Sequence, residues 1–230
     1  MYYGIDYTYI FVIIGAIITM VAQALVTGKY RKYKDVSSNG RLTGRDIARK
    51  ILDANGLENV KVQRVDGELT DHYDPTNKTV NLSSHIYEDN SIASVAVAAH
   101  ECGHAIQDKV GYTFLRIRHM MVPTVNLCSK LGYVAIFIGL LADFLNIAIV
   151  GLVMLGAILI FQLVTLPVEF NASSRAKKQL NQLGLIDSRG ARGVSDMLFA
   201  AALTYVAALA SSVLQILRLF LIVMGRRNRH

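Results

Sequence analysis

The sequence has few cysteines and few charged residues, and both shortages exclude classes of protein. Its 230 residues include 2 cysteines, Cys102 and Cys128, which provide neither a disulfide framework nor a CxxC pattern for zinc. Charged residues make up 18% of the chain and hydrophobic residues 53%. The mean hydropathy of +0.36 is too high for an ordinary soluble domain. No basic stripe is interleaved with aromatic residues, so we expect no nucleic-acid partner despite a net charge of +7.

The hydrophobic excess is concentrated in runs long enough to cross a bilayer. These runs cover residues 9–26, 119–142, 147–166 and 203–224, and the last is interrupted by Arg218. We therefore predict about four transmembrane helices. Two of them are open to question, because the run 119–142 contains Pro123 and Lys130 and because the last helix need not cross fully. Residues 9–26 could instead be a secretory signal, but basic residues follow this run and none precedes it, which favours an uncleaved anchor.

The distribution of Lys and Arg predicts the orientation in the membrane. Residues 27–118 contain 14 of them, residues 167–200 contain 5 and residues 1–8 contain none. Four crossings place both basic segments on one side, which the positive-inside rule makes the cytoplasm. The basic tail at 226–229 opposes this arrangement, because four crossings would place it outside the cytoplasm. Either the last helix does not cross, or the other basic segments determine the orientation.

We expect five segments along the chain. They are an anchor (1–26), a cytoplasmic α+β domain (27–118), a transmembrane hairpin (119–166), a cytoplasmic helix (167–200) and a last transmembrane helix with a basic tail (201–230). In the α+β domain, Thr43 and Asp46 predict a capping box before an apolar helix face. Strands are predicted at 60–65, 68–73 and 78–82, the first two as a hairpin around Asp66-Gly67. Residues 79–82 are our candidate for a free sheet edge that pairs with a peptide, and the alternative is an ordinary strand that covers the helix.

The segment His100-Glu101-Cys102-Gly103-His104 is an HExxH motif in a run that favours a helix. Residues four apart lie on one face of a helix, so the two imidazoles can hold one zinc ion while Glu101 reaches its water as general base. The preceding residues 91–99 are small and apolar, without Pro or Gly, as a packed active-site helix requires. Cys102 points elsewhere and is interpreted as a packing residue.

Catalytic zinc usually has a third protein ligand, and Glu169 is our candidate for it. Two crossings separate His104 from Glu169, so the topology returns both to one membrane face. Asp187 and Asp196 lie on that face too. Asp187 belongs to a turn-rich stretch, however, and we expect Asp196 to cap the last helix.

These motifs resemble a known family. The segments Ala99–Gln107 and Pro167–Ala176, with Asp71–Pro75 and Ala202–Ala207, are similar to the YugP-type neutral zinc metallopeptidases of bacterial membranes. The resemblance covers nearly the whole chain. It implies a multi-pass protease of the bacterial plasma membrane with Glu169 as third zinc ligand. More distantly, the chain resembles the HtpX-type and CAAX prenyl proteases, which have Asp where this chain has Ser173, so a carboxylate that orients a ligand histidine is missing there.

The sequence thus predicts an α-helical membrane protein with a small α+β zincin-like cytoplasmic domain that carries the HExxH helix. Its expected function is zinc-dependent endopeptidase activity on peptides or membrane proteins, with Glu101 as base and His100, His104 and Glu169 as Zn²⁺ ligands. The tetrahedral oxyanion needs a further donor, for which Tyr205 and His72 are our candidates ahead of Tyr73 and Arg175. Two alternatives remain, an intramembrane-cleaving zinc protease and a non-catalytic membrane zinc sensor or scaffold. The sequence does not indicate the oligomeric state.

Overall fold

The fold is taken from a computed structural model that describes residues 7–38 and 40–227, so the end of the basic tail lies outside the described residues. The chain divides into two compact units, and each is described here by itself. The helical unit comprises Met1–Gln23, Ile117–Leu166 and Thr204–His230. The mixed unit comprises Ala24–Arg116 and Pro167–Leu203.

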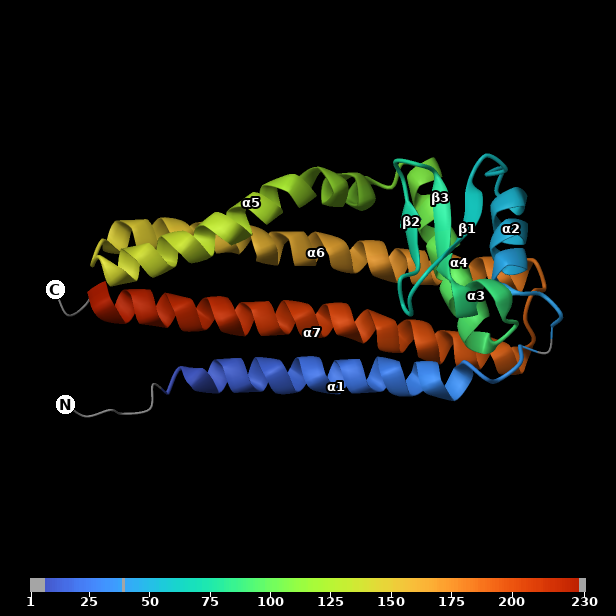
Figure 1. The fold of residues 1–230 in the computed structure, drawn as a ribbon, viewed down its shortest axis with the longest axis horizontal. Coiled ribbons are helices and arrows are strands. Elements are labelled where there is room, and N and C mark those ends of the chain that lie inside the picture. Colours follow the sequence, from blue (N-terminus) through green and yellow to red (C-terminus); the bar gives the residue numbers. More distant parts are fainter. Residues whose placement is uncertain (1–6, 39, 228–230) are drawn as a thin grey trace. The chain divides into compact units, whose positions relative to one another are not determined.

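Four long helices are apolar enough to cross a membrane, which confirms the predicted number of spans. They are α1 (Tyr9–Tyr33), α5 (Thr113–Leu141), α6 (Leu145–Gln182) and α7 (Ser188–Arg227), as Figure 1 shows. Each extends beyond the apolar run that predicted it. Pro123 and Pro167 lie within α5 and α6 without ending them. Residues 167–200 accordingly do not form a separate helix, because they contribute to the end of α6 and the start of α7.

Small residues set the packing in the helical unit. A Cβ atom on Gly139 would lie 2.5 Å from the backbone nitrogen of Ala148, and one on Gly151 would lie 2.6 Å from the carbonyl oxygen of Gly132. The two helices of the α5–α6 hairpin therefore touch backbone to backbone, as small residues permit in membranes. Asp143 makes the turn between them with a positive φ of 60°.

Arg218, which interrupts the last apolar run, has an aromatic partner within the helical unit. Its guanidinium lies 4.4 Å from the centre of the Tyr9 ring. A cation over a ring face is stabilised by the quadrupole of the ring, and this contact gives the arginine a partner inside an apolar helix.

The mixed unit contains a three-stranded sheet whose order differs from our prediction. The strands β1 (Lys61–Val65), β2 (His72–Asp74) and β3 (Thr79–Ser83) lie in the order β1-β3-β2, with β1 parallel and β2 antiparallel to β3 (Figure 1). The predicted hairpin of the first two strands is wrong, and so is the predicted free edge at 79–82. Every residue of β3 is buried, which agrees with its central position between β1 and β2.

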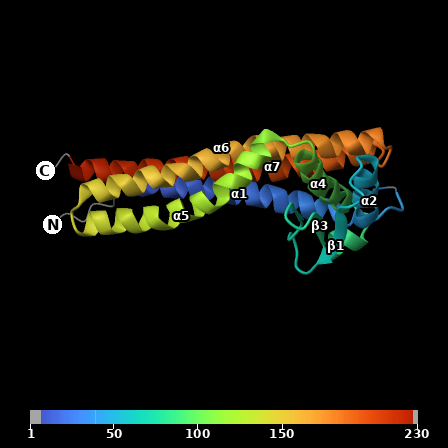
Figure 2. The same ribbon diagram turned by 90° about the horizontal axis from the view of Figure 1, so that it is seen from above.

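Helices cover one face of this sheet. The helix α2 (Gly44–Ala54) begins at the capping box of Thr43 and Asp46, as predicted, and is followed by α3 (Ser84–Glu88) and α4 (Ile92–Lys109). In Figure 2, α4 lies in the same region as β1 and β3. A hydrogen bond and a backbone contact join α4 to the Pro167–Gln182 part of α6. The core is built from the buried faces of α2, α4 and β3, including Ile47, Ala48, Ile51, Leu52, Val80, Leu82, Val95 and Ala99.

The start of α7 corrects another expectation. Asp187, and not Asp196, caps this helix, because Asp187 Oδ1 accepts a hydrogen bond from the backbone nitrogen of Gly190 at 2.7 Å. Asp196 lies two turns into α7, where its carboxylate accepts from Lys29 Nζ at 2.6 Å and from Tyr33 Oη at 3.1 Å.

The capping box gives a stability prediction for the mixed unit. Thr43→Ala removes the hydroxyl that accepts from the Asp46 backbone nitrogen, so we expect a loss of about 1 kcal/mol in the free energy of unfolding. The measurement is denaturant unfolding in detergent. Thr70→Ala is the control, since Thr70 is an exposed residue outside any helix. Equal stability of the Thr43→Ala variant and wild type would contradict the prediction.

Candidate metal centre

The two histidines of the HExxH motif lie one turn apart near the middle of α4. Ser91 caps this helix by accepting from the Ser94 backbone nitrogen at 3.1 Å, which fixes where the helix starts. The rings of His100 and His104 meet edge to face, with centroids 4.8 Å apart. Cys102 points away from them, as expected, and its sulfur contacts the carbonyl oxygen of Ala48.

Glu169 of α6 reaches both histidines. Its Oε2 atom lies 3.3 Å from His100 Nε2 and 3.7 Å from His104 Nε2, and its side chain is 3% exposed. One ligand atom from each of the three residues lies within 4.8 Å of the others, and no other described His, Cys, Asp or Glu residues form such a group. Two imidazole nitrogens and one carboxylate oxygen are a donor set that suits zinc.

The glycine of the motif permits this approach of α6. A Cβ atom on Gly103 would lie 2.5 Å from the carbonyl oxygen of Ala172 and 3.1 Å from its Cα atom. The backbones of α4 and α6 therefore touch at the turn that carries the histidines. This contact brings α6 close enough for the Glu169 carboxylate to reach the imidazoles.

Each histidine is oriented by a neutral partner on its outer nitrogen. His100 Nδ1 lies 3.2 Å from the hydroxyl oxygen of Ser173, and His104 Nδ1 lies 3.0 Å from Gln107 Oε1. The Nε2 atoms consequently face Glu169. Metal-binding histidines in proteins characteristically engage their second nitrogen in this way, so the residues fit the zinc that the sequence implies.

The charges around His104 favour a cation at this point. Burial disfavours the imidazolium, but its hydrogen bond to the Glu169 carboxylate and the charges of Glu101 and Glu169 outweigh burial and raise the pKa of His104. The same negative surroundings would stabilise a divalent ion bound between these side chains.

Glu101 has a second carboxylate near it that our sequence reasoning missed. Glu101 is 8% exposed on α4, and its charge contributes to the electrostatic environment of Asp71. Burial, and then this charge, raise the pKa of Asp71, although hydrogen bonds from Ser83 act against them. The Asp71 carboxylate accepts from the backbone nitrogen of Ser83 at 2.7 Å, which ties it to the end of β3.

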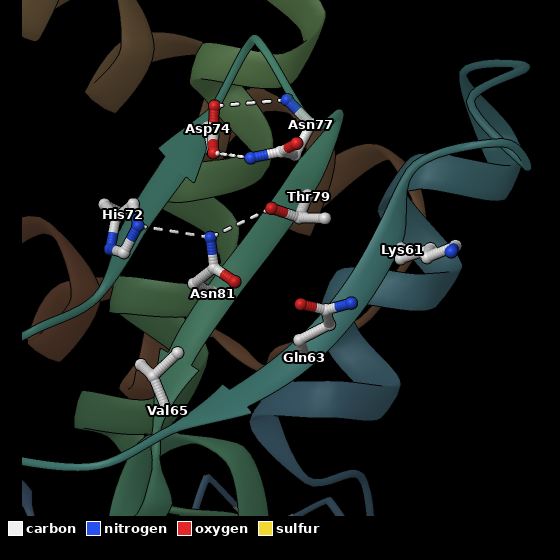
Figure 3. Close-up of a pocket in the computed structure, with 8 residues that line it drawn as sticks. All are labelled: Lys61, Gln63, Val65, His72, Asp74, Asn77, Thr79 and Asn81. Atoms are coloured by element: carbon white, nitrogen blue, oxygen red, sulfur yellow. Dashed lines mark hydrogen bonds between the residues drawn. The ribbon is translucent and has the colours of Figure 1, made fainter.

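The structure does not bring His72 together with the three presumptive ligands. Side chains alternate along a strand, and Tyr73 points to α4, where its hydroxyl donates to Asp108 at 2.7 Å. His72 therefore points to the opposite face of the sheet. There it contacts Asn81 and lines a polar hollow of about 460 Å³ with Lys61, Gln63, Asp74 and Thr79 (Figure 3). Tyr205 belongs to the helical unit, and its role remains a prediction.

The contact of Tyr73 with Asp108 fixes the edge strand β2 on α4, the helix that carries His100 and His104. Asp108 follows His104 by four residues and so lies on the same face of α4. Burial and the hydrogen bond to Asp108 raise the pKa of Tyr73, so its hydroxyl stays protonated and donates. Lys78 Nζ donates to the same carboxylate at 2.5 Å. The spacing of Asp108 from the histidines could have indicated this contact, but the sequence does not show its partner.

The fold and site define a class, a mostly α-helical protein with four potential membrane spans and a His-His-Glu group that could hold a metal ion. Comparison with known proteins then identifies the family. A family model described as "Putative neutral zinc metallopeptidase" matches residues 8–224, and the chain belongs to this family. It is 43% identical over 223 residues to the "Putative membrane protease YugP" of Bacillus subtilis (strain 168), a match that covers 96% of this chain and 99% of that protein. No solved structure matches the chain.

The contact at Gly103 predicts a linked loss of stability and metal. In Gly103→Ala the new methyl group would meet backbone atoms of Ala172, which cannot move as a flexible side chain would, so α4 and α6 must separate. We expect a destabilisation of about 1–3 kcal/mol and a reduced zinc content after purification. Thermal unfolding in detergent and elemental analysis measure both.

The control for this prediction is Gly156→Ala. Gly156 also lies within a helix, but no heavy atom lies within 4 Å of the position that its Cβ atom would take. This variant should keep wild-type zinc content and stability. A Gly103→Ala protein that behaves like Gly156→Ala would show that the two helices do not need this contact.

Proposed function

We propose that this protein is a zinc-dependent endopeptidase that hydrolyses peptide bonds at the cytoplasmic face of the bacterial plasma membrane. The observation that carries the proposal is the convergence of His100, His104 and Glu169 in a buried site, with Glu101 adjacent to His100 on the same helix. Membership of a zinc metallopeptidase family supports the same chemistry.

His100 and His104 would hold the metal through Nε2, and Glu169 through Oε2. Zinc bound there would lower the pKa of a coordinated water and polarise the scissile carbonyl. Glu101 would accept a proton from the attacking water and deliver it to the leaving amine as the C–N bond breaks. A site that only binds zinc has no need of a base at this position, so Glu101 favours hydrolysis over a sensor or scaffold.

The edge strand β2 supports an extended peptide as substrate. Among the described strands, β2 pairs on one side only, with β3, so its other side can hydrogen-bond to a further strand. Tyr73 and Asp108 hold β2 against the helix that carries the histidines. An unfolded or juxtamembrane segment of a protein would meet this requirement, whereas a folded helix would not.

The reaction is tested with Glu101→Gln. The amide keeps the size of the side chain but cannot accept the proton, so we expect cleavage of casein to fall about 100-fold or more while zinc content stays unchanged. Elemental analysis and a protease assay in detergent measure the two quantities. Equal cleavage by wild type and variant would reject Glu101 as the base, and with it the proposed mechanism.

Two further glutamate variants complete this test. Glu169→Ala removes a proposed metal ligand, so this protein should lose both zinc and activity. Glu58→Gln changes an exposed glutamate of the mixed unit and should alter neither. Full zinc retention in Glu169→Ala would exclude Glu169 as a ligand.

The cytoplasmic orientation is tested by labelling in intact bacterial spheroplasts. In a background with Cys128 replaced by Ala, a membrane-impermeant maleimide should modify Phe144→Cys, in the α5–α6 turn. It should modify Asp66→Cys, in the exposed turn after β1, only after the membrane is opened. Cys102 is buried and contributes little background. Labelling of Asp66→Cys in intact spheroplasts would reverse the proposed orientation.

A further inference from the structure

A chain of hydrogen bonds leads from His104 to Arg175 and crosses from α4 to α6. Gln107 follows His104 by three residues and is fully buried, and its Oε1 atom lies 3.0 Å from His104 Nδ1. Its Nε2 atom donates to the carbonyl oxygen of Val168 at 2.8 Å and to Asn171 Oδ1 at 3.0 Å. Arg175 Nε donates to the same Asn171 oxygen at 2.7 Å.

The direction of every bond in this chain follows from Arg175. A guanidinium can only donate, so the Asn171 atom that faces it must be the oxygen. The Gln107 atom that faces this oxygen must then be the amide nitrogen, and the carbonyl of Val168, which can only accept, requires the same orientation. The Gln107 oxygen therefore faces His104, and Nδ1 of His104 must carry the proton.

The protonation of Nδ1 leaves the Nε2 lone pair of neutral His104 free for a metal. This lone pair faces Oε2 of Glu169 at 3.7 Å, so two acceptors confront each other across a buried space. Such a pair is stabilised by a cation between them, which can be a proton on Nε2 or a metal ion. Gln107 thus selects the tautomer in which His104 can be a zinc ligand.

We propose that Gln107, Asn171 and Arg175 form an amide relay that fixes the metal-binding tautomer of His104 and thereby sets the zinc affinity of the site. Gln107 acts directly on His104, while Asn171 and Arg175 are positioning residues that act through Gln107. The relay takes the place of the carboxylate that commonly orients a zinc-bound histidine. This inference depends on the proposed function, because it assumes that the site binds zinc.

The relay is tested by the zinc dissociation constant of the full-length protein in detergent, measured by competition with a fluorescent chelator. Gln107→Met and Asn171→Leu each break the relay, and we expect zinc binding to weaken by about 10- to 100-fold. Asn171→Asp cannot donate but still offers an oxygen to both Arg175 and Gln107. It should therefore bind zinc nearly as tightly as wild type.

The control is Gln179→Met, which removes another amide of α6. Gln179 Oε1 accepts from Asn55 Nδ2 at 2.9 Å, so this variant also loses a hydrogen bond between helices, but one that does not lead to a histidine. Its zinc affinity should be unchanged. The unfolding temperature of each metal-free variant separates a change in the site from a change in the fold.

Absorption spectra of the Co²⁺-loaded proteins provide a second readout. Gln107→Met should alter the visible bands, because His104 can then offer either nitrogen, whereas Asn171→Asp should reproduce the wild-type spectrum.

Zinc binding in Asn171→Asp as weak as in Asn171→Leu would overturn the assigned bond directions. Equally weakened zinc binding in Gln179→Met would show that the effect comes from a general loss of packing and not from the relay. Wild type that binds no zinc would refute the proposed function itself, and tight wild-type binding with unaffected variants would refute only the relay.

Discussion

The backbone contact between α4 and α6 is the constraint on which the metal centre depends. Gly103 allows the carbonyl of Ala172 to approach within a distance that any side chain would prevent. The proposed ligands on the two helices can then meet in the buried interior. Fixing a glutamate side chain costs rotamer entropy, and the packing of the two helices offsets this cost. The geometry of the metal centre is therefore determined by the core of the mixed unit.

The same contact explains why the polar residues around the site come from both helices. Two touching helices leave no room for water between them, so each buried polar atom needs a protein partner. Ser173 on α6 meets His100, and Gln107 on α4 meets the backbone of α6. Neutral partners satisfy the outer histidine nitrogens without adding a negative charge to the buried carboxylates of Glu101 and Glu169. A further buried carboxylate there would require its own compensation.

Local patterns allowed the helices and the shared helix face of His100 and His104 to be predicted, whereas the pairing of the strands did not follow from them. The spacing of His100 and His104 and the capping box at Thr43 depend on residues three or four apart, and helix geometry translates such spacings directly. The order of the strands depends on which strand is buried on both faces. The Asp66-Gly67 turn signal does not determine this, so the hairpin prediction was wrong. The first and third strands were found near their expected positions, whereas β2 shares only residues 72 and 73 with the predicted strand 68–73.

The roles of single side chains at the site were harder to predict for a related reason. Alternation along β2 decides that Tyr73 and not His72 faces α4, and this phase depends on the pairing with β3. A shift of one residue would exchange the two faces. Gln107, by contrast, carried a signal in the sequence, because a polar residue three positions after His104 lies on the same side of the helix and can reach its imidazole. Its importance became evident only when Arg175 fixed the direction of the bonds that reach it.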